Sequence, residues 1–155
     1  MYDSEVYSLS SDFISAYPRN QYPELLMKQA RPLQCLLLDV SPDYFICIPF
    51  RSRISHSNAY MFKNSKRSMV TKSGLDYSKV ILIKDSKYLT SQNVVVDQDE
   101  YNEAQINMPR IVSEITSYID TYINHINGTS VLHHKQFDRL YEFSTLKYFH
   151  NILGI

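Results

Sequence analysis

The chain has 155 residues, 44% of them hydrophobic, with 16 basic and 16 acidic side chains that give no net charge. This length and composition suffice for one hydrophobic core, so we expect a single domain over residues 1–155. Three glycines and the lack of a biased tract exclude collagen-like and disordered classes. A zero net charge argues against a nonspecific polyanion binder, although it does not describe how the charges are distributed.

Strands are predicted before helices. Short runs of branched and aromatic residues indicate strands. They lie at residues 5–9, 33–40, 44–50, 80–83 and 94–96, with a further strand near 60–62. Residues 33–40 and 44–50 are joined by the turn Ser41-Pro42-Asp43 and predict a hairpin. A short helix over residues 11–17, capped by Ser10 or Ser11 and ended by Pro18, interrupts the strands.

Downstream of the strands the hydrophobic period becomes helical. Apolar residues recur every three or four positions from Ile111 to Ile126 and predict a helix that ends at Gly128. Asp97 with Glu100 indicates a capping box for an earlier helical turn, which Pro109 separates from the longer helix. Residues 133–143 and 144–153 predict two more helical segments, the second capped by Ser144. This order predicts an α+β fold, with a compact, twisted antiparallel sheet and mainly C-terminal helices packed on one side.

The sequence shows neither a signal-peptide pattern nor an apolar run long enough to span a membrane. No basic segment followed by an apolar stretch opens the sequence, and the run Leu36-Leu37-Leu38 ends at Asp39. We therefore expect no membrane span. Cys35 and Cys47 lack metal-ligand spacing and predict reduced, buried thiols, as in a cytoplasmic protein. A disulfide across the hairpin is the alternative, but directly opposed antiparallel positions suit disulfide geometry poorly.

The charges are segregated along the chain. Residues 51–87 carry nine basic and only two acidic side chains, whereas residues 97–120 carry six acidic side chains against Arg110. The basic segment also contains Tyr60, Phe62 and Tyr77 among serines and asparagines. Cations, aromatic rings and small polar groups together are typical of surfaces that bind phosphates and stack unpaired bases. A solvated surface is the alternative interpretation of such a run.

The densest cluster of reactive groups is at the end of the second predicted strand of the hairpin. There Arg51-Ser52-Arg53-Ile54-Ser55-His56 places guanidinium, hydroxyl and imidazole groups in about one turn of chain. RNA cleavage through the 2′-hydroxyl requires a proton acceptor, cations for the phosphorane oxygens and a proton for the leaving oxygen. Arginine and histidine provide such groups without a metal. Arg31 precedes the other hairpin strand and is expected to lie beside Arg51.

Other kinds of site have less support in the sequence. His134 and Asp138 share a helical face next to His133 and could hold a divalent metal, as in a metal-dependent nuclease. Exposed histidines at a helix start are the simpler interpretation, so we predict no metal and no cofactor. The sequence also lacks a P-loop, a G-x-G-x-x-G turn and a G-x-S-x-G elbow.

Four stretches resemble the endoribonuclease toxins of type III, RNA-inhibited toxin–antitoxin systems, the ToxN, TenpN and CptN group, most closely its CptN and TenpN branch. These stretches follow one another along most of the chain. They are Arg31-Pro32, Ile48-Pro49-Phe50-Arg51-Ser52 through His56 and Tyr60, Gly74-Leu75-Asp76-Tyr77-Ser78-Lys79, and Ser144-Thr145-Leu146-Lys147-Tyr148-Phe149-His150.

The resemblance implies a fold, an activity and a partner. The fold would be a twisted sheet related to the SH3-like barrel of the MazF and Kid toxins, with added helices. The activity would be metal-independent cleavage of target mRNA that leaves a 2′,3′-cyclic phosphate. The partner would be a small inhibitory pseudoknot RNA, processed from a repeat array, that assembles with the toxin into an RNA-mediated hetero-oligomer.

The resemblance also implies site residues. Arg31 takes the position of a family lysine, and Ser52 that of the serine in a threonine-serine pair. Arg51 replaces the threonine, and Ile54 falls where a later lysine is expected, so His56 or Arg53 would supply the function of that lysine.

The sequence thus predicts a catalytic group and an RNA-binding group of residues. The catalytic residues would be Arg31, Arg51, Ser52 and His56, and the RNA-binding residues Arg53, Tyr60, Lys63, Lys66, Arg67 and Lys79. The alternative function is a non-catalytic RNA-binding regulatory module.

Overall fold

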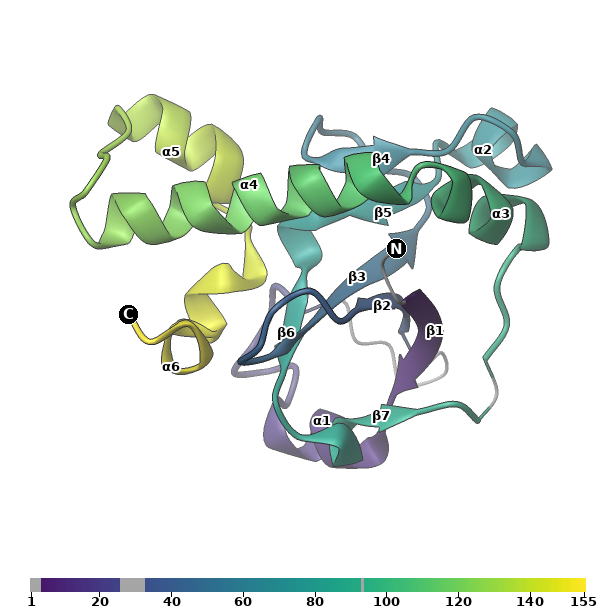
Figure 1. Cartoon of the computed structure of the whole chain (residues 1–155), viewed down its shortest axis with the longest axis horizontal. Helices are drawn as coiled ribbons and strands as arrows, with labels where there is room; N and C mark the ends of the chain where they lie inside the picture. The colour runs from purple at the N-terminus through teal and green to yellow at the C-terminus, as the bar shows by residue number, and fades with distance from the viewer. Residues whose placement is uncertain (1–3, 26–32, 93) are drawn as a thin grey trace.

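The computed structural model describes residues 4–25, 33–92 and 94–155. In these ranges the fold is α+β, with a seven-stranded antiparallel sheet and six α-helices (Figure 1). The strands are β1 (Ser4–Leu9), β2 (Gln34–Leu38), β3 (Phe45–Arg51), β4 (Ala59–Met61), β5 (Gly74–Asp76), β6 (Ile81–Ile83) and β7 (Leu89–Thr90). The helices are α1 (Ser11–Ala16), α2 (Lys66–Thr71), α3 (Gln98–Ile106), α4 (Met108–Ile126), α5 (His134–Tyr141) and α6 (His150–Leu153), with 3₁₀ turns η1 (Tyr77–Lys79), η2 (Ser86–Tyr88) and η3 (Thr145–Tyr148).

The sheet is organised around β3. Its strand order is β4-β5-β3-β2-β1-β7, and β6 pairs with β3 outside this path. The predicted hairpin is confirmed, since β2 and β3 pair antiparallel with Cys35 opposite Pro49. On its other edge β3 pairs with β5 at Phe50 and Arg51, and with β6 over residues 45–47. The turn η1 therefore joins two strands that occupy opposite ends of one edge of β3.

The sheet is open in the described ranges. β4 and β7 stand at the two ends of the strand order and do not pair with each other there. The predicted α+β class is thus confirmed, but closure into an SH3-like barrel is not.

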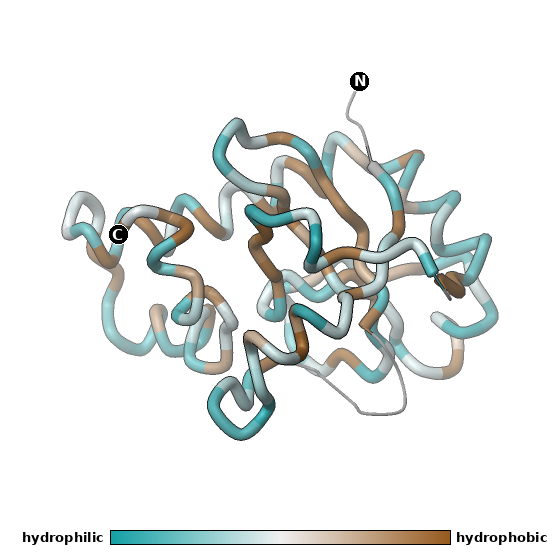
Figure 2. Tube along the Cα trace, turned by 90° about the horizontal axis from the view of Figure 1, so that it is seen from below, coloured by the Kyte–Doolittle hydropathy of each residue, from teal (hydrophilic) through white to brown (hydrophobic). Residues whose placement is uncertain are grey.

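The helical core follows the predicted period. The apolar side of α4 buries Ile111 and Ile115 completely, together with Ile81, Leu82 and Phe149. In Figure 1 α4 runs along much of the molecule, with α3 beyond its N-terminal end and α5 beside its C-terminal half. Figure 2 shows the hydrophobic segments concentrated in the interior and hydrophilic colour on the outer loops. No helix in the described residues has the length and apolar character needed to cross a bilayer.

The predicted helix ends are largely confirmed. Ser10 accepts a hydrogen bond from the N–H of Phe13, and Ser144 caps η3 in the same way at Leu146. Asp97 caps α3, and Pro109 stands at the start of α4. The capping box itself is not formed in α3, because the Glu100 side chain is buried against other residues instead of returning to the cap.

The sequence prediction is wrong for residues 94–96 and incomplete around β5. The valine run at 94–96 pairs with no described strand, and Val95 is 81% exposed. These residues have high β-propensity, but no described strand lies beside them to form a ladder. A two-residue strand, β7, forms just before it. The strand β5 was not predicted, because its three residues depend on β3 and β4 on either side. A Cβ at Gly74 would collide with the carbonyl oxygen of Tyr60, so β4 can approach β5 closely only at a glycine.

Candidate functional site

A buried carboxylate, Asp76, holds the candidate site together. Its side chain is fully buried at the end of β5. It accepts hydrogen bonds from Arg51 Nη1 at 2.8 Å and from Ser78 Oγ at 2.6 Å, and His56 Nε2 lies at 3.2 Å. The backbone N–H of Ser78 donates a further bond of 3.0 Å. Because a buried carboxylate is costly unless it is paired, these partners are held close to it.

The register of the strands explains why these residues meet. Arg51, the last residue of β3, lies opposite Gly74 in β5, two residues before Asp76. Asp76 in turn lies opposite Ala59 in β4, which follows the loop that carries His56. Asp76 also caps η1 by accepting the N–H of Ser78, so the turn fixes the carboxylate. The cluster thus sits where three strand ends and η1 meet.

The imidazole of His56 is oriented from both nitrogens. Nδ1 accepts the backbone N–H of Asn58 at 3.1 Å, which assigns the ring proton to Nε2. Nε2 faces Asp76 and also lies 3.3 Å from Ser78 Oγ. The side chain is 31% exposed. A carboxylate behind an imidazole orients it and stabilises the imidazolium that forms when the ring takes a proton.

Arg51 brings a second exposed group to the same carboxylate. Its side chain is 33% exposed, and one nitrogen, Nη1, binds Asp76. A guanidinium has five N–H donors in a rigid fork, so donors remain that can bind an anion. Ser52 follows Arg51, half-buried, in the bend after β3. The arrangement can therefore bind a phosphate beside a histidine.

The loop after β3 is fastened to α2. Arg53 has a positive φ of 58°, and its N–H donates to the carbonyl of Thr71 at 2.6 Å. The N–H of Ile54 donates to the carbonyl of Lys72 at 3.1 Å. The side chain of Arg53 is exposed, as is that of Lys66 at the start of α2. These bonds bring two basic segments to one side of the site.

Two buried carboxylates of α3 accept hydrogen bonds from the basic segment, residues 51–87. Glu103 accepts the N–H groups of Lys63 and Asn64, each at 2.9 Å, and the hydroxyl of Tyr60 at 2.8 Å. Glu100 accepts the hydroxyls of Ser65 and Ser73. The acidic and basic blocks of the sequence are therefore in direct contact, with the carboxylates inside and the cations outside.

The predicted site residues have different environments. Arg51 and His56 are brought together, whereas Arg31 lies outside the described residues. Of the predicted RNA contacts, the exposed ones are Arg53, Lys63 and Lys66, and Arg67 is 37% exposed with Nη1 3.8 Å from Glu100. Tyr60 and Lys79 are buried. Tyr60 binds Glu103, and the Lys79 ammonium donates to Glu24 and to the carbonyl of Phe143.

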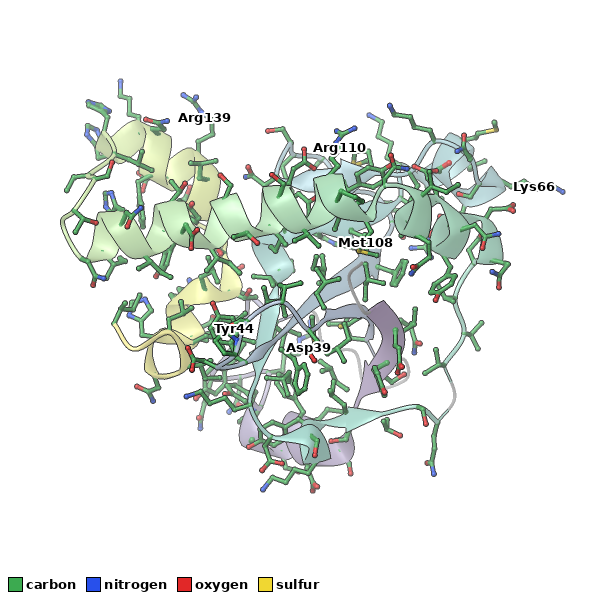
Figure 3. All side chains as sticks on the ribbon, viewed as in Figure 1. Asp39, Tyr44, Lys66, Met108, Arg110 and Arg139 are labelled. Carbon is green, nitrogen blue, oxygen red and sulfur yellow. The ribbon has the colours of Figure 1, made fainter. Side chains whose placement is uncertain are left out.

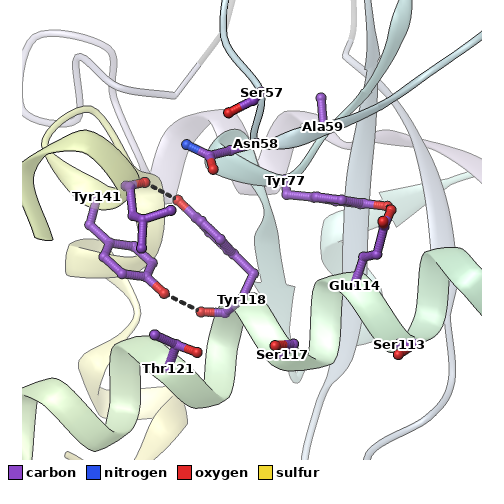
Figure 4. Close-up of a pocket in the computed structure, with 11 residues that line it drawn as sticks. Ser57, Asn58, Ala59, Tyr77, Ser113, Glu114, Ser117, Tyr118, Thr121 and Tyr141 are labelled. Carbon is purple, nitrogen blue, oxygen red and sulfur yellow. Dashed lines mark hydrogen bonds between the residues drawn. The ribbon is translucent and has the colours of Figure 1, made fainter. Parts of the chain in front are cut away.

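A groove of about 410 Å³ opens beside the cluster (Figure 4). It lies between the loop that follows His56, η1, α4 and the end of α5. The lining residues are Ser57, Asn58, Ala59, Tyr77, Ser113, Glu114, Ser117, Tyr118, Thr121, Leu140 and Tyr141. In Figure 3, Arg110 and Arg139 lie along the upper side of the molecule, on α4 and α5, and Lys66 projects from α2 at its right-hand end. Arg110 and Arg139 thus belong to the two helices that border the groove.

The alternative sites gain no support. Across the described ranges no group of three or more histidine, cysteine or acidic side chains could hold a metal. His133 instead caps α5 by accepting the N–H of Lys135. Cys35 and Cys47 are free and buried, and burial raises the pKa of both thiols. The predicted buried thiols are confirmed.

Two residues of the site, Asp76 and Ser78, are absent from the predicted site residues. Both lie in one of the stretches that resemble type III toxins, but the sequence pattern assigned them no role. The signal that could have revealed them is the Asp-Tyr-Ser spacing directly after a buried strand, because an aspartate at that position commonly binds the N–H two residues later.

No protein-family model, curated protein or solved structure matches this chain.

The buried tyrosines near the site predict a loss of stability at alkaline pH. Burial, followed by the hydrogen bond to Glu103, raises the pKa of Tyr60 to about 12, and burial likewise raises the pKa of Tyr77, next to Glu114. A raised tyrosine pKa favours the fold at and below pH 10, and this contribution is lost as pH rises from 10 towards 12. Urea unfolding across this range should show a falling free energy of unfolding, less steep in Tyr60→Phe. A free energy of unfolding that stays constant over this range would contradict the assignment.

Proposed function

We propose that this protein is a metal-independent endoribonuclease that cleaves RNA at the cluster of Arg51, His56, Asp76 and Ser78. The observation that carries the proposal is a fully buried Asp76 that holds a guanidinium and an imidazole, each about one third exposed, side by side. Exposed cations on the loop after β3 and on α2 extend from this cluster, as a polyanionic substrate requires. The four sequence stretches that resemble type III toxins support the same proposal.

The proposed reaction uses the 2′-hydroxyl of the substrate. His56 Nδ1 takes the proton of that hydroxyl while the 2′-oxygen attacks phosphorus and the bond to the 5′-oxygen breaks. The products are a 2′,3′-cyclic phosphate and a 5′-hydroxyl, whose proton comes from water. Arg51 binds the phosphate oxygens on which charge accumulates, and Asp76 stabilises the imidazolium.

The hydrogen bond from Asn58 to His56 adds a condition to this reaction. Nδ1 is occupied by the Asn58 N–H in the free protein. The 2′-hydroxyl must replace this N–H before His56 can act as a base. Proton transfer is therefore coupled to a small movement of the loop at residues 57–58 when substrate binds.

The test is cleavage of a defined RNA by the purified chain in the presence of EDTA. Cleavage should persist, and the products should carry 2′,3′-cyclic phosphate and 5′-hydroxyl ends. Arg51→Ala and His56→Ala should each lower the rate at least about 100-fold. Arg19→Ala, which removes an exposed arginine from the loop after α1, is the matched control and should cleave like wild type.

The other outcomes identify other functions. RNA binding without cleavage would indicate a non-catalytic RNA-binding module. Cleavage that EDTA abolishes would indicate a metal-dependent nuclease. A protein that neither binds nor cleaves RNA would overturn the proposal.

The biological setting that we propose is a type III toxin–antitoxin system in the cytoplasm. The partner would be a pseudoknot RNA that occupies the basic surface and assembles with the toxin, and an SH3-like arrangement of the sheet would accord with that group. Expression of the chain should be toxic without the neighbouring upstream DNA and harmless with it, and that DNA should hold a tandem repeat. Ser52→Ala should remove the toxicity at the same expression level, because Ser52 takes the position of the family's site serine. Harmless wild-type protein would overturn this setting but not RNA cleavage itself.

A further inference from the structure

The groove beside the cluster has the character of a site for a planar, partly polar ligand. Its sides are tyrosine rings, and Figure 4 shows Tyr77 and Tyr118 on either side of the hollow, with Ser117 below and Asn58 above. Their hydroxyls are satisfied, since Tyr77 donates to Glu114 and Tyr118 to the carbonyl of Leu140. The rings are thus fixed in place. A volume of about 410 Å³ accommodates one nucleotide.

The groove adjoins the proposed reaction centre through two of its lining residues. Asn58, which lines it, donates its backbone N–H to His56. Tyr77, which forms one side, stands in sequence between Asp76 and Ser78 and donates its backbone N–H to the carbonyl of Asn58. A ligand in the groove therefore lies next to the phosphate that Arg51 would hold.

The polar groups in the groove favour a base over a phosphate. Glu114 accepts from Tyr77 through Oε1 and from Arg110 through Oε2, and its side chain stays 37% exposed. A carboxylate repels phosphate, but each of its oxygens can accept a second hydrogen bond. An exocyclic amino group of a base is the matching donor, as in the contact of acidic side chains with cytosine N4.

We propose that this groove binds the base next to the scissile phosphate and selects bases that carry an exocyclic amino group over uracil. This inference rests on the proposed function, since it places the phosphate at Arg51 and His56. Tyr77 and Tyr118 enclose the base, Glu114 accepts from its amino group, and Asn58 and Ser117 provide further hydrogen-bonding groups. The substrate class is single-stranded RNA, because a base in a duplex could not enter.

The experiment measures binding of the whole chain to 5′-fluorescein-labelled 2′-O-methyl hexamers of A, C and U, which cannot be cleaved. The C and U hexamers are the decisive pair, since these bases have the same ring size and differ in the amino group. Fluorescence anisotropy should show the C hexamer bound about 10-fold more tightly than the U hexamer. Glu114→Gln should bring this ratio close to one, because the amide offers a donor as well as an acceptor.

A second variant blocks the groove and leaves the hydrogen bonds of Glu114 in place. Ser117→Phe fills the groove from an exposed position of α4, and should weaken binding of the A and C hexamers to the level of the U hexamer. Thr116→Phe, the neighbouring exposed position outside this groove, is the matched control and should retain the preference.

The possible outcomes distinguish failure of the base site from failure of the proposed nuclease. Equal binding of all three hexamers, unchanged in Ser117→Phe, would overturn the base site and leave RNA cleavage intact. A preference for C over U without cleavage of ordinary RNA would support the base site and overturn the nuclease. A chain that binds none of the hexamers and cleaves no RNA would overturn both.

Discussion

Asp76→Asn is expected to lower both the rate of RNA cleavage and the stability of the fold. The amide is close to the carboxylate in shape, but it has no charge and points N–H donors at Arg51 or Ser78. Breaking a buried ion pair costs about 3 kcal/mol of free energy of unfolding. Arg51 and His56 also lose the group that holds them, so the cleavage rate should fall at least about 100-fold. Urea unfolding and RNA cleavage of the same preparation measure the two effects.

The chain contains a matched control for this substitution. Asp85 caps η2 by accepting the N–H of Lys87, just as Asp76 caps η1, but its side chain is 52% exposed and its ion pair with Lys87 spans 3.7 Å. Asp85→Asn should change the free energy of unfolding by less than about 0.5 kcal/mol and leave cleavage unchanged. If Asp76→Asn behaved like Asp85→Asn, the buried carboxylate would have no special role.

Glu103→Ala is expected to release the basic segment from α3. The substitution leaves the N–H groups of Lys63 and Asn64 and the hydroxyl of Tyr60 without their acceptor. The Tyr60 bond is buried and the two amide bonds are part-buried, in residues that are themselves exposed. An unsatisfied buried group costs about 1–3 kcal/mol and a part-buried one less, so the loss should be about 2 kcal/mol. Hydrogen exchange should become faster at the amides of Lys63 and Asn64. RNA affinity should fall as well, since α2 carries exposed cations.

Two substitutions separate this interaction from charge alone. Glu103→Gln keeps an oxygen that can accept both amides and should cost less than the alanine variant. Asp99→Ala removes a carboxylate from the exposed first turn of the same helix and should change stability by less than about 1 kcal/mol. If Glu103→Ala kept wild-type stability and slow exchange at Lys63 and Asn64, the role of Glu103 in holding this segment would be refuted.

The contact between the acidic segment, residues 97–120, and the basic segment, residues 51–87, alters the interpretation of the zero net charge. Six acidic side chains in residues 97–120 offset the basic segment in sum, yet Glu100 and Glu103 are buried beneath it. These two carboxylates hold backbone amides and hydroxyls and are not exposed to repel RNA. The cations above them remain exposed. A chain without net charge can thus present a basic surface.

Strongly periodic segments could be predicted from sequence. The hairpin of β2 and β3 follows from two apolar runs and a proline-aspartate turn, and α4 follows from its repeating isoleucine and tyrosine positions. In both, residues close in sequence determine the result. Short elements such as β5 could not be predicted, because their few residues are stabilised by strands distant in sequence.

The sequence by itself determined the α+β class, the two buried thiols and the grouping of Arg51 with His56 near the end of a strand. Only the tertiary structure decided that a third residue, Asp76, lies between them, and that Tyr60 and Lys79 are used inside the fold. The physical reason is the cost of burying charge. Which carboxylate is buried, and which basic groups then surround it, depends on strand register and on contacts between residues that are twenty or more positions apart.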